Sequence, residues 1–271
     1  MLPIYEAIGF KEKITKGGTT YPWIVNVLEG DMPKPYIVKL FTDRQIEQQQ
    51  SVAKEVFGSV LAQQFDLCVP KPALINFSDN FYQTLDNELK KELESKNKGI
   101  KFGCAYYEDM AVIEVSKVKS ILKDYEVGNI FGFDNLVRNI DRGGFRNKPN
   151  LLINDEGFLL IDHELILPFA NASGNPSILN EIGGKNWGYQ YEKHLLYPYL
   201  KRLKRDKKLH IFDTFAEYLK TFNPDSLDVY AIQLDQNFSM PIGDFDLLKS
   251  YLYKVKQNSS WFIENLKRLI K

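Results

Sequence analysis

The side chains best suited to chemistry lie between residues 133 and 163. Asp141 follows an apolar helical pattern that ends in the turn Asn-Ile-Asp-Arg, and Asn150 directly precedes a pair of leucines. Asp162 follows a second apolar run, twelve positions beyond Asn150, which leaves room for two short strands and a turn. This hairpin brings all three side chains to strand ends. Phosphoryl transfer from a nucleotide needs such a set, with a carboxylate near the acceptor hydroxyl and oxygen ligands that hold Mg²⁺ between phosphates.

Two further charged residues lie early in the chain, in apolar surroundings. Lys39 stands inside the segment Ile-Val-Lys-Leu, which favours a strand. Glu55 shares one face of a predicted helix over residues 45–64 with small and apolar side chains. We therefore expect its carboxylate to point into the protein, where it needs a partner. The order of these residue types along the chain is that of the corresponding parts of protein kinases: Lys39, Glu55, Asp141, Asn150 and Asp162.

The elements that must position these residues divide the chain into a strand-rich first part and a helix-rich second part. The strands that we expect cover residues 23–40 as a hairpin, residues 73–77, the residues after 102, and a β-like stretch at 151–167. Charges of both signs predict an exposed helix or helical insertion over residues 86–101. Beyond residue 116 the rest of the pattern is mainly helical, so we expect a boundary near residue 115.

Composition excludes several classes of protein. The 271 residues include 44% apolar and 13% aromatic side chains, which rules out a disordered chain. With 35 basic and 35 acidic residues the net charge is zero, so a nucleic-acid partner or an anionic membrane is not expected. Cys68 and Cys104 are too few for a disulfide framework or a four-cysteine zinc site. Without an export signal or an apolar run of about 18 residues, the expected location is the cytoplasm.

Three motifs together carry a resemblance to a known family. They are Asn139-Ile140-Asp141-Arg142, Pro149-Asn150-Leu151-Leu152 and Ile161-Asp162-His163, joined by Lys39, by Glu55 and by Val69-Pro70-Lys71-Pro72-Ala73. From about Thr15 to Phe169 the chain resembles the HipA-like kinases, bacterial relatives of the protein-kinase and phosphoinositide-kinase superfamily, in their compact branch. The resemblance implies an α+β, two-lobed protein-kinase-like fold. A small β-rich N-terminal lobe over residues 1–115 would bind nucleotide, and a larger, mainly helical C-terminal lobe over 116–271 would carry the catalytic loop and the metal site.

The resemblance also implies roles for individual residues. Lys39 would contact the α and β phosphates of ATP, oriented by Glu55. Asp141 would be the catalytic base or the carboxylate that positions the acceptor, and Arg142 would orient Asp141 or neutralise developing charge. Asn150 and Asp162 would hold magnesium.

The sequence departs from the family pattern in two places. The loop from Asp141 to Asn150 is long, which leaves open whether Asn147 or Asn150 reaches the metal. The usual glycine pattern over the phosphates is absent. The backbone N–H groups of the segment from Thr15 to Thr20, above all those of Gly17, Gly18 and Thr19, could bind phosphate in its place.

The function that follows from the resemblance is an ATP- and Mg²⁺-dependent phosphotransferase of the Ser/Thr protein kinase type. It would move the γ-phosphate to a hydroxyl-bearing acceptor, with a protein favoured over a small molecule. HipA relatives can act as growth-arresting toxins, which makes an antitoxin or another regulatory protein a candidate partner. The alternatives are a small-molecule kinase, a pseudokinase or nucleotide-gated binding module, and a metal-dependent nuclease built on Asp134, Asp141 and Asp162.

The remaining histidines and the basic run carry weaker signals. His163 has no second ligand at a metal-binding spacing, so we expect a structural role, and His194 and His210 belong to no cluster. Six bases among residues 201–208 predict a solvated helix face; a docking patch for an acidic protein or RNA is the alternative.

Overall fold

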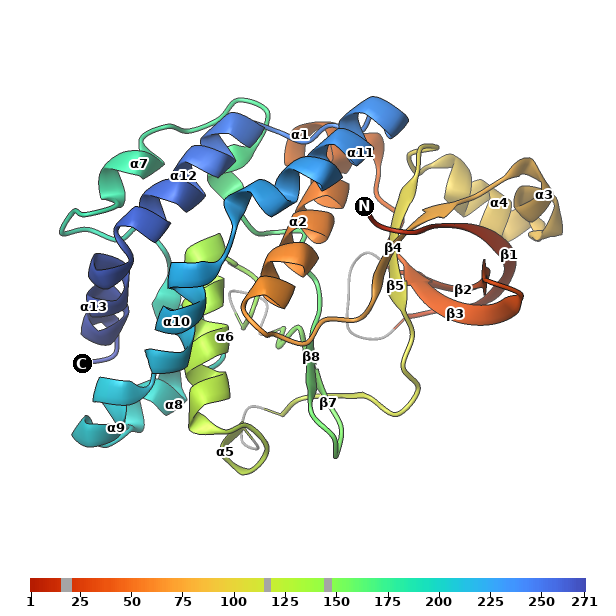
Figure 1. Ribbon diagram of the computed structural model, residues 1–271. Coiled ribbons are helices and arrows are strands. Elements are labelled where there is room, and N and C mark those ends of the chain that lie inside the picture. The colour runs from red at the N-terminus through yellow and green to blue at the C-terminus, as the bar shows by residue number, and fades with distance from the viewer. Residues whose placement is uncertain (16–20, 115–117, 144–147) are drawn as a thin grey trace.

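The computed structural model describes residues 1–15, 21–114, 118–143 and 148–271. Five strands close a barrel at one end of the molecule (Figure 1). In spatial order they are β1 (Ile4–Lys13), β2 (Trp23–Glu29), β3 (Met32–Val38), β5 (Lys101–Ala105) and β4 (Pro72–Asn76). Neighbouring strands run antiparallel, except that β4 closes the barrel parallel to β1. The predicted hairpin over residues 23–40 is therefore confirmed as β2 and β3.

Side chains that alternate along β2 and β3 fill the barrel. Trp23 pairs across the strands with Val38, and Val25 pairs with Tyr36, and all four are buried in one apolar cluster. This period of two is what a strand with one face on a core requires. Strand β1 was not anticipated. Only Ala7 of its ten residues is buried, so the strand has almost no apolar alternation to reveal it.

The helix predicted over residues 45–64 is two helices. Helix α1 (Asp43–Gln49) ends at Gln50, which adopts a left-handed conformation with φ 52°, and α2 (Ser51–Gln64) starts directly afterwards. Thr42 caps α1 by accepting a hydrogen bond from the Gln45 N–H at 3.3 Å. In α2 every residue from Ser51 to Ala62 is buried, because the helix is covered on all sides.

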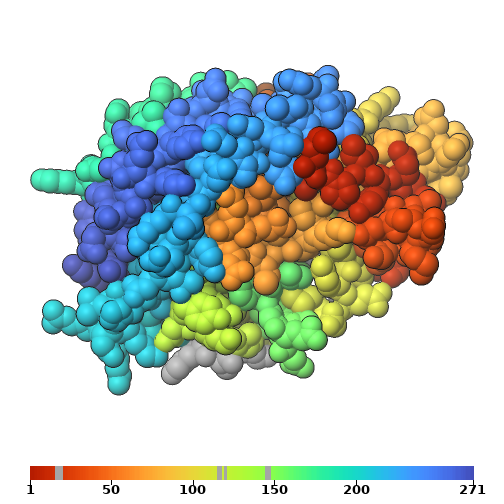
Figure 2. All heavy atoms as spheres, in the orientation of Figure 1, coloured from red at the N-terminus to blue at the C-terminus, as the bar shows by residue number. Residues whose placement is uncertain are grey.

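Helix α2 lies between the barrel and the C-terminal helices. Phe65, at its end, contacts the rings of Phe133, Phe215 and Phe222, and the largest apolar cluster joins α2 to these helices. Figure 2 shows α2 in orange between the blue helices and the red strands. The exposed charged segment is α4 (Asn87–Glu94), preceded by α3 (Asp79–Thr84); α4 has no buried residue, as predicted.

A small antiparallel sheet carries the hairpin that the sequence predicts. Its strands are β6 (Ala111–Val112), β7 (Leu151–Ile153) and β8 (Phe158–Leu160). The boundary expected near residue 115 falls on residues 115–117, outside the described residues.

The rest of the chain is helical, which confirms the α+β character. Its helices are α5 (Val118–Ile121), α6 (Asp124–Val137), α7 (Ile178–Glu181), α8 (Tyr197–Arg202), α9 (Arg205–His210), α10 (Asp213–Thr221), α11 (Asp228–Phe238), α12 (Phe245–Gln257) and α13 (Ser259–Leu269), with 3-10 turns η2 (Pro168–Ala170), η3 (Tyr191–Lys193) and η4 (Pro224–Leu227). The basic run forms α8 and α9, whose charged side chains are mostly exposed. Among the described residues, no helix combines the length and the apolar character that a membrane span requires.

Candidate active site

Lys39 lies one residue beyond the strand in which the sequence pattern places it. Strand β3 ends at Val38, but the Lys39 N–H still donates to the Phe102 carbonyl of β5 at 3.0 Å, so the barrel fixes its backbone. Its ammonium group forms ion pairs with Glu55 and with Asp162, the latter at 2.5 Å. The side chain is 13% exposed, so these contacts form in a partly buried site.

Glu55 extends from the buried helix α2 toward Lys39. One of its oxygens accepts from Lys39, and the other accepts from the His163 N–H at 3.1 Å. The residue is 1% exposed. The expectation of an inward-facing carboxylate with a partner is therefore confirmed, and the same carboxylate links α2 to the segment that follows β8.

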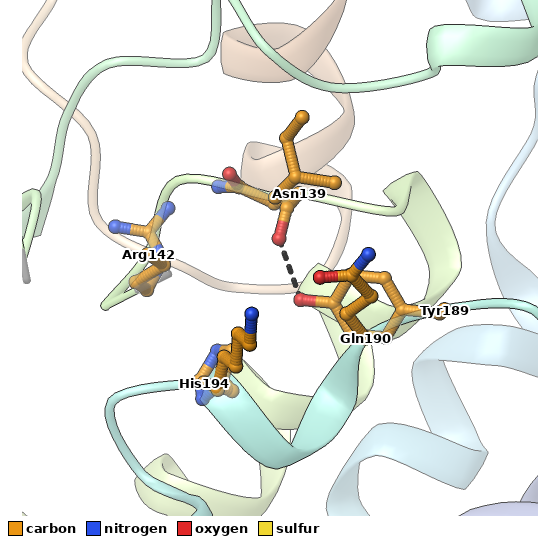
Figure 3. A pocket seen from close by; sticks show the side chains of 7 residues that line it. Asn139, Arg142, Tyr189, Gln190 and His194 are labelled. Atoms are coloured by element: carbon orange, nitrogen blue, oxygen red, sulfur yellow. Dashed lines mark hydrogen bonds between the residues drawn. The ribbon is translucent and has the colours of Figure 1, made fainter. Parts of the chain in front are cut away.

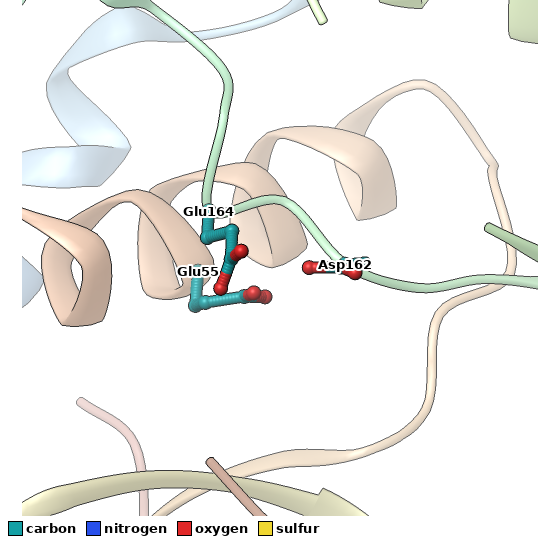
Figure 4. A group of neighbouring side chains, drawn as sticks. All are labelled: Glu55, Asp162 and Glu164. Carbon is teal, nitrogen blue, oxygen red and sulfur yellow. The ribbon is translucent and has the colours of Figure 1, made fainter. Parts of the chain in front are cut away.

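Three carboxylates converge at this point (Figure 4). Oxygens of Glu55, Asp162 and Glu164 lie within 4.8 Å of one another. Glu164, which the sequence pattern did not single out, places Oε2 3.9 Å from the Lys39 ammonium group. That oxygen is buried and has no hydrogen-bond partner among the described residues. Asp162 itself has φ 65°, a left-handed conformation that is costly for a non-glycine residue and is typical of functional sites.

The pKa values of this cluster show an excess of negative charge. Burial raises the pKa of Glu55 to about 7, although Lys39 opposes the shift. Burial, together with Asp162, also raises the pKa of Glu164. Burial acts in the same direction on Asp162, but the attraction of Lys39 outweighs it and holds the Asp162 pKa below its ordinary value. Carboxylates outnumber the cation, and one carboxylate oxygen is unpartnered, so the site fits a divalent cation with oxygen ligands.

Asp141 and Asn150 meet in the loop beyond α6. The Asp141 N–H donates to Asn139 Oδ1 at 3.0 Å, and Asn150 Nδ2 donates to Asp141 Oδ2 at 3.2 Å. No described residue hydrogen bonds Asn150 Oδ1, the atom that would ligate a cation. Asn150 also has a left-handed backbone, with φ 46°, and its carbonyl accepts from the Ile161 N–H at 3.1 Å. This hydrogen bond joins the Asp141 loop to the residue before Asp162.

Arg142 lies beneath the loop that carries Asp141. Its side chain is fully buried, its Nε donates to Asp134 at 2.5 Å, and its Nη1 donates to the Asn150 carbonyl. The guanidinium group is enclosed beneath the loop, which favours the alternative that Arg142 orients Asp141 over direct neutralisation of developing charge. It holds the backbone of Asn150, and through Asn150 it contributes to the position of Asp141.

Asp134 and His194 form a buried network that no local sequence pattern indicates, since 60 residues separate them. His194 Nε2 lies 2.8 Å from Asp134 Oδ2, and His194 Nδ1 accepts from the Leu196 N–H at 3.1 Å. His194 Nε2 must therefore carry the proton and donate it to Asp134. Burial lowers the pKa of His194 and keeps the ring neutral. Figure 3 shows His194 and Arg142 beside the small pocket that Asn139 and Tyr189 also line.

This network contradicts the nuclease alternative. Asp134 is 0% exposed and its oxygens are already bonded, so it cannot share a metal with Asp141 and Asp162. Within the described ranges, the group of three acidic side chains whose oxygens lie close enough together to share a metal is Glu55, Asp162 and Glu164.

Among the described residues, the hydrogen bond that joins His163 to the site comes from its backbone N–H. Its ring is buried, and burial lowers its pKa to about 3. The ring packs so closely on α2 that a Cβ at Gly58 would lie 2.5 Å from His163 Cβ. This packing accords with the structural role expected for His163.

Some predicted site residues lie outside the described residues: Gly17, Gly18, Thr19 and, at the long loop, Asn147. Strands β1 and β2 pair antiparallel on either side of the glycine pair, and the Ile14 N–H donates to the Pro22 carbonyl at 2.9 Å.

The chain is similar to known kinases in sequence and in fold. A family model described as HipA-like kinase matches residues 9–174. No curated protein matches the chain. Among solved structures, the crystal structure of a Helicobacter pylori proinflammatory kinase, CtkA, is similar with a TM-score of 0.53 and 13% sequence identity, over 93% of this chain and 96% of that chain. At this identity the likeness extends to the fold alone.

Proposed function

The chain belongs to the HipA-like kinase family, and on this premise we propose that it transfers the γ-phosphate of ATP to a hydroxyl acceptor in a Mg²⁺-dependent reaction. Membership supports a phosphotransferase in general. We further propose that the acceptor is a serine or threonine hydroxyl of a protein. In this proposal residues 1–115 form the nucleotide-binding lobe and residues 116–271 form the lobe with the catalytic loop.

The observation that carries the proposal is the contact of Lys39 with both Glu55 and Asp162. These residues come from the barrel, from α2 and from the segment after β8, so only the fold brings them together. Protein kinases require a lysine–glutamate ion pair together with an aspartate that binds Mg²⁺, and Lys39, Glu55 and Asp162 bring these residue types to one place.

In this proposal Lys39 and Glu55 act on the phosphates of ATP. Glu55 is buried and keeps the ammonium group in place, and the ammonium group supplies positive charge to the α and β phosphates. Because the side chain of Lys39 is mostly shielded from water, its attraction for phosphate oxygens is screened less than at an exposed site.

The residues proposed to hold magnesium are Asn150 and Asp162. Asn150 presents Oδ1, since its Nδ2 is engaged by Asp141, and Asp162 presents a carboxylate beside the unpartnered oxygen of Glu164. Magnesium bound there supplies charge that neutralises the β and γ phosphates.

Asp141 is proposed to position the acceptor hydroxyl and to take its proton. The Asn150 amide donates to Oδ2, and the Lys148 ammonium group lies 3.9 Å from the same oxygen. The backbone N–H of Asp141 is held by Asn139. Oδ1 of Asp141 accepts from no described residue and is the atom left for the hydroxyl.

A thermal shift experiment tests this proposal. The melting temperature of the purified chain is measured with ATP, with and without Mg²⁺, beside Asp162→Asn. Nucleotide at 100 times its dissociation constant should stabilise the fold by about 2.7 kcal/mol. Asp155→Asn, an exposed aspartate in the turn between β7 and β8, is the matched control and should respond like the wild type.

A shift that needs magnesium and is lost only in Asp162→Asn supports the proposed site. If neither nucleotide nor metal changes the melting temperature of the wild type, active phosphotransfer is refuted, and the chain is a degenerate kinase fold used for binding.

A further inference from the structure

Asp134 is the buried carboxylate to which the proposed reaction assigns no direct part. It lies on α6, three residues before the helix ends at Val137, and its side chain is fully enclosed. Burial would raise its pKa, but Arg142 and His194 hold the pKa below its ordinary value, so the group is ionised. An ionised carboxylate in such a place is costly unless its oxygens are well bonded.

Both oxygens of Asp134 receive hydrogen bonds from the segments around the loop. Oδ1 accepts from Asn139 Nδ2 at 3.0 Å. Oδ2 accepts from Arg142 Nε at 2.5 Å and lies 2.8 Å from the protonated nitrogen of His194. The carbonyl of Asp134 also accepts from the Asn139 N–H at 2.9 Å.

The first two of these side-chain bonds lead to different parts of the proposed site. Asn139, held by Oδ1, uses its own Oδ1 to accept the backbone N–H of Asp141 at 3.0 Å. Arg142, held by Oδ2, donates from Nη1 to the carbonyl of Asn150. These two chains of hydrogen bonds from Asp134 meet where Asn150 Nδ2 donates to Asp141 Oδ2.

We propose that Asp134 is a positioning residue, whose single carboxylate fixes the proposed base Asp141 relative to the proposed metal ligand Asn150. This inference rests on the proposed function. Catalysis by positioning depends on small distances, and a displacement of about 1 Å can reduce a rate roughly 100-fold. Because the Asp134 carboxylate accepts from both Asn139 and Arg142, it prevents the base Asp141 and the metal ligand Asn150 from moving independently.

The third bond secures the network from the side of the C-terminal helices. His194 donates to Asp134, and the next residue, Leu195, donates its N–H to the Arg142 carbonyl at 3.0 Å. Tyr189 donates its hydroxyl to the Asn139 carbonyl at 2.6 Å (Figure 3). These hydrogen bonds hold the segment 189–195 against the loop that contains Asn139 and Arg142.

Asp134→Asn tests the inference, because it keeps the shape of the side chain but replaces one acceptor with a donor. The assay measures ADP formed from ATP and Mg²⁺, with water or hydroxyls of the chain as the acceptor. We expect kcat to fall about 100-fold while KM for ATP is retained. KM is retained because Lys39, Glu55 and Asp162, which form the proposed nucleotide site, do not contact Asp134.

Asn129→Ala is the matched control for loss of stability. Asn129 is a buried polar residue of the same helix, and its amide donates to the Phe65 carbonyl rather than to the loop. It should lower the melting temperature and leave kcat unchanged. Asn139→Ala is the second variant, for use if Asp134→Asn does not fold. It leaves the bonds of Asp134 to Arg142 and His194 in place, removes the link to Asp141, and should lower kcat with KM unchanged.

The outcomes separate the two proposals. An inactive wild type refutes the proposed function, and with it the inference. An active wild type with unchanged kcat in a folded Asp134→Asn, or in Asn139→Ala where the first does not fold, refutes the inference alone. An equal loss of kcat in Asn129→Ala also refutes it, because the effect would then be general destabilisation.

Discussion

Replacing Lys39 with methionine should make the stability of the protein decline with pH above neutrality. In the wild type the pKa of Glu55 is about 7, against an ordinary value of 4.5. Between these values the folded state holds a proton that the unfolded chain has lost, so stability falls as pH rises. The loss is about 1.4 kcal/mol per pH unit, or roughly 3 kcal/mol over the window, and it levels off above about pH 7.

Lys39 lowers the pKa of Glu55, so its removal moves that pKa above 7. The decline in stability should then continue beyond neutrality at about 1.4 kcal/mol per pH unit. Burial strengthens the effect, since the Glu55 side chain is only 2% exposed and has no other cation among its described partners. Breaking a buried pair in this way costs roughly 3 to 5 kcal/mol where the remaining charge persists.

Urea unfolding of both proteins at several pH values between about 6 and 9 measures the effect. Lys34→Met is the control, because Lys34 lies on β3, the strand that leads into Lys39, is 53% exposed and pairs with Glu29 at 3.3 Å. An exposed pair contributes at most about 1 kcal/mol, so this variant should level off like the wild type. If Lys39→Met also levels off at pH 7, Lys39 does not govern the ionisation of Glu55, and the reasoning fails.

Three further predictions concern the surroundings of the site. Arg142→Met leaves Asp134 as a buried charge without its strongest partner and should cost about 3 to 5 kcal/mol in urea unfolding; a loss under about 1 kcal/mol would show that the pair is not structural. Burial lowers the pKa of His194, so the unfolded chain takes up the proton first and the free energy of unfolding falls as pH drops below about 6.5. His194→Gln should remove about 1.4 kcal/mol per pH unit from this pH dependence. An identical pH dependence in the variant and the wild type would contradict a neutral His194. Gly58→Ala would place a Cβ 2.5 Å from His163 Cβ and should lower the free energy of unfolding by about 1 to 3 kcal/mol. It should also weaken the Mg²⁺-dependent thermal shift. An unchanged shift would show that the packing of α2 against His163 does not affect the metal site.

The parts of the site that could be predicted are those encoded in short motifs. Asp141, Asn150 and Asp162 lie within 22 positions of one another, so a helix end and one hairpin suffice to place them. Lys39 and Glu55 belong to a strand end and a neighbouring helix. The small and apolar residues around Glu55 indicate that its carboxylate faces inward. The identity of the partners was therefore predictable, although their exact contacts were not.

The parts that could not be predicted depend on tertiary structure. Asp134 meets His194 because α6 and the segment before α8 pack together, and no local pattern records this contact. Strand β1 is mostly exposed, so its sequence shows little alternation of apolar and polar residues. The end of α1 at Gln50 is marked by neither glycine nor proline. The inward direction of Arg142 follows from the buried acid on α6, which an adjacent Asp-Arg pair in a turn does not reveal.

The measurement that tests the central claim most directly is ADP formation from ATP and Mg²⁺ by the wild type and by Asp141→Asn. The proposed role of Asp141 as base predicts turnover by the wild type and a loss of about 100-fold to 10,000-fold in the variant. The nucleotide-dependent thermal shift should persist, since Lys39, Glu55 and Asp162 are unchanged. A variant that turns over as fast as the wild type, or a wild type that binds nucleotide and forms no ADP, would contradict the account.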